Sequence, residues 1–144
     1  MKDVLIVCYG MGCGGAEKSL ISFLNRLPKD RWNVDLIVAN PNGMYMKQIP
    51  STVHFLNNQY ELENFATPMS LRRKKVCNGR DLINQASWQI KSRFLCKNLS
   101  WNEKRWELWG KHLPKLKKRY DLAISYMNGP TNYYVIDKVT AKKK

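Results

Sequence analysis

The sequence predicts an α/β fold, a Rossmann-like three-layer parallel sheet with a basic helical insert, on three observations. Mostly apolar runs of strand length occur at residues 4–8, 34–39 and 122–126, as in strands that are buried on both faces of a parallel sheet. A helical repeat of apolar residues separates the first two runs, and their spacing of about 30 residues is that of a βαβ unit. A strongly basic segment, residues 70–119, separates the second run from the third.

Length and composition indicate one domain. The chain has 144 residues, of which 44% are hydrophobic and 25% charged, and this is enough for a single core. No apolar run is long enough to cross a bilayer, and the opening run is too short for the core of a signal peptide. We therefore expect residues 1–144 to form one cytoplasmic domain.

Because the chain stops at a lysine run, where an α/β protein would begin its next strand, we expect it to be a fragment of a longer protein.

The first apolar run leads into a glycine-rich turn. Glycines stand at positions 10, 12, 14 and 15, and a helical repeat follows at once. Glycine reaches positive φ and has no Cβ, so a ligand can approach the backbone of such a turn closely. The unpaired N–H groups and the dipole at the start of the following helix favour an anion such as a phosphate. The pattern predicts a ligand-facing loop between a strand and a helix.

The remaining elements follow from the apolar pattern. A core-packing helix that ends at Pro28 is predicted by apolar residues at helical spacing, namely Ala16, Leu20, Phe23, Leu24 and Leu27. We then expect a strand over 34–39, a turn over 40–43, a helical turn over 44–49 and a short strand over 53–56. After the basic segment, a strand over 122–126, a turn over 128–130 and a helix over 132–139 are predicted.

The net charge of +14 is concentrated in one segment, because residues 71–119 hold 15 of the 25 basic residues and three of the 11 acidic ones. One or two helices are predicted there by two apolar repeats, Leu82, Ile83, Ala86, Ile90 and Phe94, then Trp106, Trp109, Leu113 and Leu116. Three interpretations remain open: a solvated helical hairpin, a surface for anionic lipid headgroups, and a surface for nucleic acid. The last is disfavoured, because the sequence has no RNA-binding aromatic motif or DNA-reading helix.

The cysteines and histidines encode no recognisable metal site. Cys8, Cys13, Cys77 and Cys96 include no Cys-x-x-Cys pair, and the two histidines, at positions 54 and 112, are far apart in sequence. Cys8 lies in an apolar run and is interpreted as a small buried hydrophobe. Cys13 is in the glycine loop, where a reactive thiol would need a base, and nothing near it in sequence supplies one. The sequence therefore identifies no catalytic residue.

The glycines also match the dinucleotide-binding pattern Gly10-x-Gly12-x-x-Gly15 after a strand and before a helix. That pattern requires an acidic residue at the carboxyl end of the second strand to bind the ribose. Here the second strand ends in Ala39-Asn40, and its acidic residue, Asp35, is near the start. A dinucleotide-binding domain of the NAD(P) type is therefore an alternative.

A different resemblance spans both ends of the chain. The segment Gly14-Gly15-Ala16-Glu17-Lys18-Ser19-Leu20, the opening strand, the turn Asn40-Pro41-Asn42-Gly43 and the segment 120–126 resemble the N-terminal domain of glycosyltransferase family 4. These are retaining enzymes of the GT-B fold. The resemblance implies transfer of a sugar from a nucleotide-sugar donor to a glycan or lipid-linked acceptor, in a cleft between two Rossmann-like domains.

The resemblance also implies site residues and partners. The glycine loop of the family approaches the donor diphosphate and the sugars, and this role would pass here to Gly12, Gly14, Gly15 and Glu17. By the switch-point rule, Tyr126, Asn128 and Gly129 would face the same cleft. The nucleotide-sugar is a substrate, and neither a cofactor nor a metal is expected.

The second domain of that family supplies most nucleotide contacts and a pair of glutamates, and this chain does not contain it. We therefore expect the chain to be inactive without a C-terminal domain. Attachment to the inner face of an anionic membrane through residues 71–119 is a further expectation, and the alternative functions are a basic nucleic-acid-binding module and the dinucleotide-binding domain.

Overall fold

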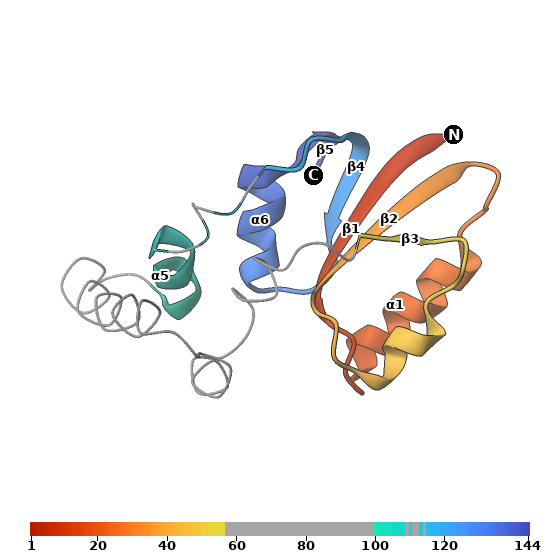
Figure 1. Ribbon diagram of the computed structural model, residues 1–144, viewed down its shortest axis with the longest axis horizontal. Coiled ribbons are helices and arrows are strands. Elements are labelled where there is room, and N and C mark those ends of the chain that lie inside the picture. The colour runs from red at the N-terminus through yellow and green to blue at the C-terminus, as the bar shows by residue number, and fades with distance from the viewer. Residues whose placement is uncertain (57–99, 109, 111–112, 114) are drawn as a thin grey trace, which may run out of the picture.

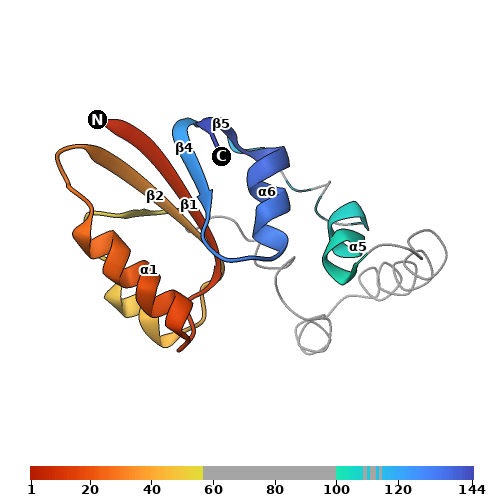
Figure 2. The ribbon, with the colours of Figure 1, turned by 180° about the vertical axis from the view of Figure 1, so that it is seen from behind.

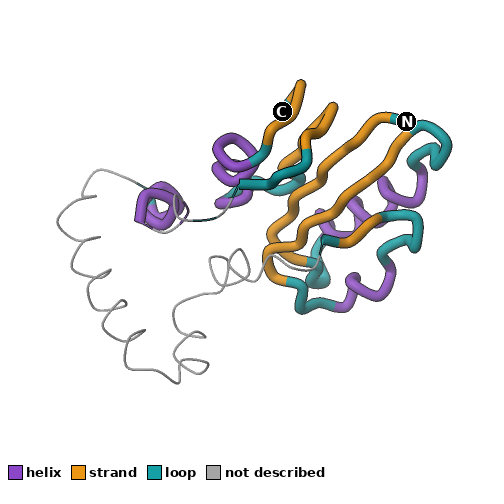
Figure 3. The backbone as a smooth tube through the Cα atoms, turned by 45° about the horizontal axis from the view of Figure 1, so that its top comes forward, coloured by secondary structure: helices purple, strands orange, loops and turns teal. Residues whose placement is uncertain are grey.

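The computed structural model describes residues 1–56, 100–108, 110, 113 and 115–144. Within these residues, five strands form one sheet in the order β3-β2-β1-β4-β5 (Figures 1 and 3). The strands are β1 (Lys2–Gly10), β2 (Trp32–Asn40), β3 (His54–Phe55), β4 (Arg119–Ser125) and β5 (Thr140–Lys143). Every strand pair is parallel. The predicted α/β fold with a parallel sheet is confirmed.

Helices lie on both faces of this sheet. Helix α1 (Gly15–Arg26) connects β1 to β2 on one face, and α6 (Pro130–Lys138) connects β4 to β5 on the other (Figure 2). The side chains of β1 alternate between them: Val4, Ile6 and Cys8 pack with α1, whereas Leu5 and Val7 pack with α6. This alternation on a strand buried from both sides produces the three-layer arrangement.

A further helix, α5 (Trp101–Leu108), packs against α6. It begins with a capping box, in which the Glu103 N–H donates to Ser100 Oγ at 3.4 Å and the Ser100 N–H donates to Glu103 Oε2 at 2.7 Å. Trp106 is buried, stacks on Tyr133 with ring centroids 5.8 Å apart, and donates from Nε1 to Asp137 Oδ2 at 2.7 Å. This tryptophan therefore belongs to the core rather than to a lipid-facing surface.

Several boundaries differ from the sequence prediction. The lysine run at the end of the chain does not precede a strand but forms one, β5, which pairs with β4. Lysine is common on edge strands because its charged end stays in water and blunts the edge. Helix α6 begins at Pro130, two residues earlier than predicted, because proline suits the first turn of a helix. The strand predicted over 53–56 is shortened to His54–Phe55.

Other predictions are met in part. Leu20 and Leu24 are buried as expected, but Phe23 is 37% exposed. The helical turn predicted over 44–49 is the 3₁₀ helix η1 (Met44–Gln48). Trp106 and Leu113 are buried, while most of the predicted basic insert, including its first apolar repeat and Trp109, lies outside the described residues. None of the helices that the structure describes has the length and apolar character needed to cross a membrane.

Candidate functional site

The candidate site lies at the carboxyl edge of the sheet, where the parallel strands end. The chain runs from β1 outward to β3 on one side and then from β4 to β5 on the other, so the switch point of the topology lies between β1 and β4. In open α/β sheets, ligands bind outside the carboxyl ends of the strands at such a point. Five of the seven predicted site residues lie in the loops that follow β1 and β4. The other two, Gly15 and Glu17, lie at the start of α1, directly after the first of these loops.

The glycine loop, Met11–Gly14, follows β1 and leads into α1. Gly14 is the N-cap of α1 and makes no side-chain capping bond, and Lys18 N–H donates to Gly14 O at 3.2 Å. Met11 is fully buried, whereas Cys13, Gly14 and Gly15 are exposed. The first turn of α1 therefore presents its backbone to solvent, as the anion-binding prediction requires.

The expected use of positive φ in this loop is wrong. Among the described residues, only Gly129 has a φ between +20° and +160°, the range that favours glycine, and its value is 150°. Of the two predicted reasons for glycine at positions 12, 14 and 15, positive φ and the missing Cβ, only the missing Cβ remains. At Gly15, a Cβ would meet no atom within 4 Å, so the space above this position is open.

Glu17 folds back over the glycine loop. A Cβ on Gly14 would overlap Glu17 Oε2, and a Cβ on Gly12 would lie 3.6 Å from Glu17 Oε1. Glu17 is the third residue of α1, where a carboxylate is favoured by the helix dipole. Three predicted site residues from one loop and one helix thus lie together.

Tyr126 crosses from the end of β4 to α1. Its N–H donates to Val7 O at 2.9 Å, and its hydroxyl lies 2.9 Å from Ser19 Oγ. Its ring stacks on Phe23 with centroids 6.3 Å apart. These contacts connect the loop that follows β4 to helix α1 on the other side of the switch point.

Asn128 and Gly129 lie at the start of α6 instead. Asn128 Oδ1 accepts from Asn132 Nδ2 at 3.1 Å, and Gly129 is the N-cap of that helix. Since α6 covers the opposite face from α1, these two residues share the carboxyl edge with the glycine loop but no contact joins them to it among those given for the described residues. The structure therefore links Tyr126 directly to α1 and keeps Asn128 and Gly129 with α6.

The described residues supply no metal site, and the two cysteines among them differ in exposure. No group of three His, Cys, Asp or Glu side chains among them could hold a metal ion. Cys8 is buried as predicted, and burial raises the pKa of its thiol to about 12. Cys13 is exposed in the loop. The arrangement can bind an anion through backbone N–H groups and provides aromatic surface at Tyr126.

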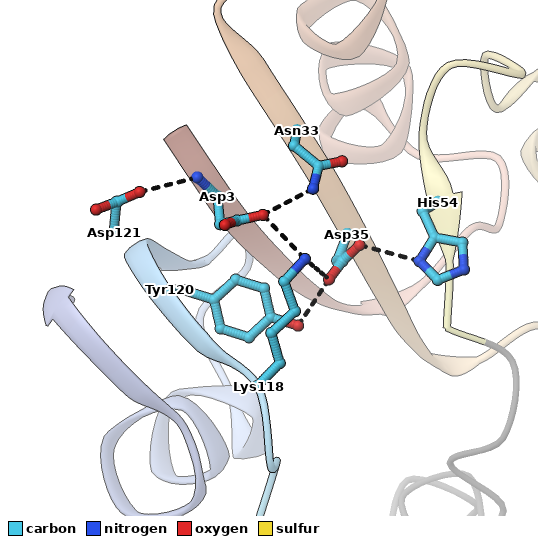
Figure 4. Close-up of polar contacts among 7 residues, drawn as sticks. All are labelled: Asp3, Asn33, Asp35, His54, Lys118, Tyr120 and Asp121. Atoms are coloured by element: carbon cyan, nitrogen blue, oxygen red, sulfur yellow. Dashed lines mark hydrogen bonds and ion pairs between the residues drawn. The ribbon is translucent and has the colours of Figure 1, made fainter. Parts of the chain in front are cut away.

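A second polar cluster lies at the amino edge, where the strands begin (Figure 4). The carboxylate of Asp35 in β2, with a side chain only 3% exposed, is its centre. One oxygen lies 3.0 Å from His54 Nδ1, and the other accepts from Tyr120 Oη at 2.8 Å and Lys118 Nζ at 3.0 Å. Lys118 also pairs with Asp3 at 3.0 Å. The Asp35 cluster therefore joins side chains from or next to four strands.

The pKa values in the Asp35 cluster follow from these contacts. Burial alone would raise the pKa of Asp35, but hydrogen bonds from Lys118, Tyr120 and His54 outweigh it and hold the pKa below its ordinary value. Burial and the hydrogen bond to Asp35 raise the pKa of the Tyr120 hydroxyl. At neutral pH the cluster is therefore an ionised carboxylate neutralised by a lysine, with a neutral tyrosine donating to it.

Sequence reasoning missed the Asp35 cluster because its partners are far apart along the chain: Asp35 and Tyr120 are separated by 85 residues. The available indication was an aspartate within the apolar run Val34–Ala39, where a charge needs a buried partner. A groove of about 370 Å³ also lies at this edge, lined by Lys2, Trp32, Asp121, Leu122, Lys142 and Lys143. It includes none of the predicted site residues.

In comparisons with known proteins, no family model, no curated protein and no solved structure matched the chain. Fold and site geometry therefore have to support any functional conclusion by themselves.

Proposed function

We propose that the chain is the N-terminal, acceptor-side domain of a retaining glycosyltransferase, which transfers a sugar from a nucleotide-sugar to a glycan or lipid-linked acceptor. The observation that supports this most is the junction at the switch point. The exposed first turn of α1 follows the glycine loop directly, and the hydrogen bond between Tyr126 and Ser19, in the next turn of α1, connects the helix to the loop after β4. A helix N-terminus in this place suits the diphosphate of a sugar nucleotide.

The proposed role of each residue follows from its position. Gly14 and Gly15 offer the diphosphate backbone N–H groups at the start of α1, with open space at Gly15, while the Glu17 carboxylate lies against Gly14 and near Gly12. Glu17 lies over the same loop, where its carboxylate can accept from a sugar hydroxyl. Tyr126, Asn128 and Gly129 form the other side of the site. A C-terminal domain is proposed to complete the cleft, so the isolated chain is proposed to be inactive.

Substituting Gly15 with valine tests this proposal. Because nothing lies within 4 Å of a Cβ at this position, we expect the fold to accept a valine, whose side chain would fill the space above the first turn of α1. We expect Gly15→Val to abolish sugar transfer by the parent protein while the circular dichroism and melting temperature of the 144-residue chain stay at wild-type values. Thr140→Val, at an exposed position at the start of β5, is the matched control. Wild-type transfer by Gly15→Val would rule out the role of the loop.

The alternative of an NAD(P)-type domain has weaker support. Asp35, the acidic residue of β2, lies at the amino edge and is bonded to Lys118 and Tyr120, far from a ribose at the carboxyl edge. The strand ends in Asn40 instead. Fluorescence titration with NADH distinguishes the two, because saturable binding would favour the dinucleotide domain.

Attachment to an anionic membrane surface on the cytoplasmic side is a further part of the proposal. Trp106 is buried and does not contribute, but Lys115, Lys117 and Arg119 are exposed at the end of the basic segment. Each basic residue near an anionic surface contributes about 1 kcal/mol. The chain should therefore co-sediment with phosphatidylglycerol vesicles at low salt and stay in the supernatant at high salt. An oligonucleotide gel shift stronger than that of a charge-matched control would favour nucleic acid instead.

A further inference from the structure

The glycine loop is in close contact with the loop that follows β2. Gly43, at the end of that loop, lies directly against the backbone of Met11. A Cβ built on Gly43 would overlap the carbonyl carbon and oxygen of Met11 and would lie 2.8 Å from Gly12 N. Because the overlapping atoms are backbone rather than the end of a flexible side chain, they can yield only if the glycine loop itself moves.

Glycine is needed at position 43 for this close approach and not for its backbone conformation. Its φ of 172° is extended, and any residue can adopt it. The missing Cβ is thus the only property of Gly43 that the structure uses.

One hydrogen bond joins the two loops at the same point, and a second one lies within the segment after β2. Tyr45 N–H, in the first turn of η1, donates to Met11 O at 3.1 Å, and Met46 N–H donates to Gly43 O at 3.3 Å. Met11 is fully buried, with its sulfur 3.9 Å from Cys8 Sγ. The glycine loop is therefore held at Met11 by two sets of contacts: the Met11 side chain packs in the core, and the Met11 backbone contacts the segment 43–45.

The glycines of the loop are much less constrained. The nearest atoms to a Cβ at Gly10 and at Gly12 are 3.6 Å away, an ordinary contact distance, and nothing lies within 4 Å at Gly15. At Gly14 the only close neighbour is the flexible carboxylate of Glu17. The glycine that the loop geometry depends on most is therefore outside the glycine-rich motif.

We infer that Gly43 is a positioning residue of the candidate site. Its missing Cβ allows the segment 43–45 to contact Met11, and this contact fixes the glycine loop and the exposed first turn of α1. The inference takes the identity of the bound ligand from the proposed function, but the positioning itself rests on the contacts of Gly43 and Tyr45.

Hydrogen exchange of the 144-residue chain, resolved to single peptides, tests the inference. In Gly43→Ala, exchange at Tyr45 and at Lys18, whose N–H donates to Gly14 O, should accelerate by about two- to tenfold, the equivalent of losing one hydrogen bond. Gly15→Ala is the matched control at Tyr45: it also adds a single Cβ beside the glycine loop, but this Cβ meets no atom, so exchange at Tyr45 should equal that of the wild type. Wild-type exchange in Gly43→Ala, or equal acceleration in both variants, overturns the inference.

The wild-type protein provides a second measurement that does not depend on whether Gly43→Ala folds. The Tyr45 amide should exchange at least tenfold more slowly than an unstructured peptide, because opening it breaks a bond to a buried carbonyl. Exchange at the unstructured rate would show that the contact with Met11 is absent and would overturn the inference.

Titration with UDP and with pyrophosphate separates the inference from the proposed function. If the wild type binds either anion, Gly43→Ala should raise the dissociation constant of that anion by about two- to tenfold, because the glycine loop is displaced. If the wild type binds neither, the proposed ligand loses its support, while the exchange data still decide the role of Gly43.

Discussion

Replacing Lys118 with methionine tests how far the buried carboxylate of Asp35 depends on its lysine partner. Methionine retains much of the length of the lysine stem and its packing beside Tyr120, over whose ring Lys118 Nζ lies 5.2 Å from the centroid. The substitution removes the hydrogen bond to Asp35 and the ion pair with Asp3, both at 3.0 Å. Asp35 would keep only Tyr120 and His54 as donors.

The size of the effect follows from burial on the two sides of the ion pair. A hydrogen bond to a charged group contributes about 1.5–3 kcal/mol, and more if its loss leaves a charge buried. Lys118 has a side chain that is 40% exposed, so water replaces part of what it donates. We therefore expect Lys118→Met to lower the free energy of unfolding by about 1–2 kcal/mol.

Urea unfolding followed by circular dichroism measures this difference, and a double-mutant cycle with Asp35→Asn assigns it to the pair. In the Asp35→Asn background, Lys118→Met should cost clearly less than in the wild type. Lys142→Met is the matched control, since it removes the exposed pair with Asp121 and should have a smaller effect. The reasoning is refuted if Lys118→Met changes the free energy of unfolding by less than about 0.3 kcal/mol, the usual error of additivity.

Two further predictions concern pH and Gly129. Because the folded pKa of Asp35 is lowered, the stability that it contributes should be complete above its unfolded pKa of about 3.9 and should be lost as the pH falls through the folded value. Because the pKa of Tyr120 is raised, its contribution should persist up to about pH 10 and decline above it, and urea titrations between pH 3 and 11 measure both limbs. At Gly129, φ is 150° and ψ is −157°, a region almost restricted to glycine, so Gly129→Ala should destabilise the protein by about 1–3 kcal/mol. Thermal unfolding measures this, and a melting temperature equal to that of the wild type would contradict it.

The local elements were predictable from the sequence. The apolar run that becomes β1 and the helical repeat of α1 were both located within a few residues, because strand and helix periods are properties of neighbouring residues. The loop after β1 was also identified. Burial of Trp106 agreed with its place in an apolar repeat, although its stacking on Tyr133 was not foreseen.

Predictions failed where an element depends on its partner. The segment Thr140–Lys143 has no strand-like apolar pattern, and it is a strand because β4 offers unpaired backbone groups beside it. Phe23 fits the helical stripe, but it is 37% exposed and stacks on Tyr126 at the end of β4 instead of packing in the core. In both cases the decisive neighbour is distant in sequence.

The sequence by itself determined that this chain alternates strands and helices, that its sheet is parallel, and that a glycine loop joins the first strand to a helix. These properties depend on the local period of apolar residues and on the missing side chain of glycine, and both are independent of tertiary contacts. Only the tertiary structure decided that β1 lies between β2 and β4, that Asp35 is neutralised by Lys118, and that Gly43 supports the glycine loop. Each of these requires side chains or backbones from separate strands to meet in space, and no pattern along the chain specifies which of them will meet.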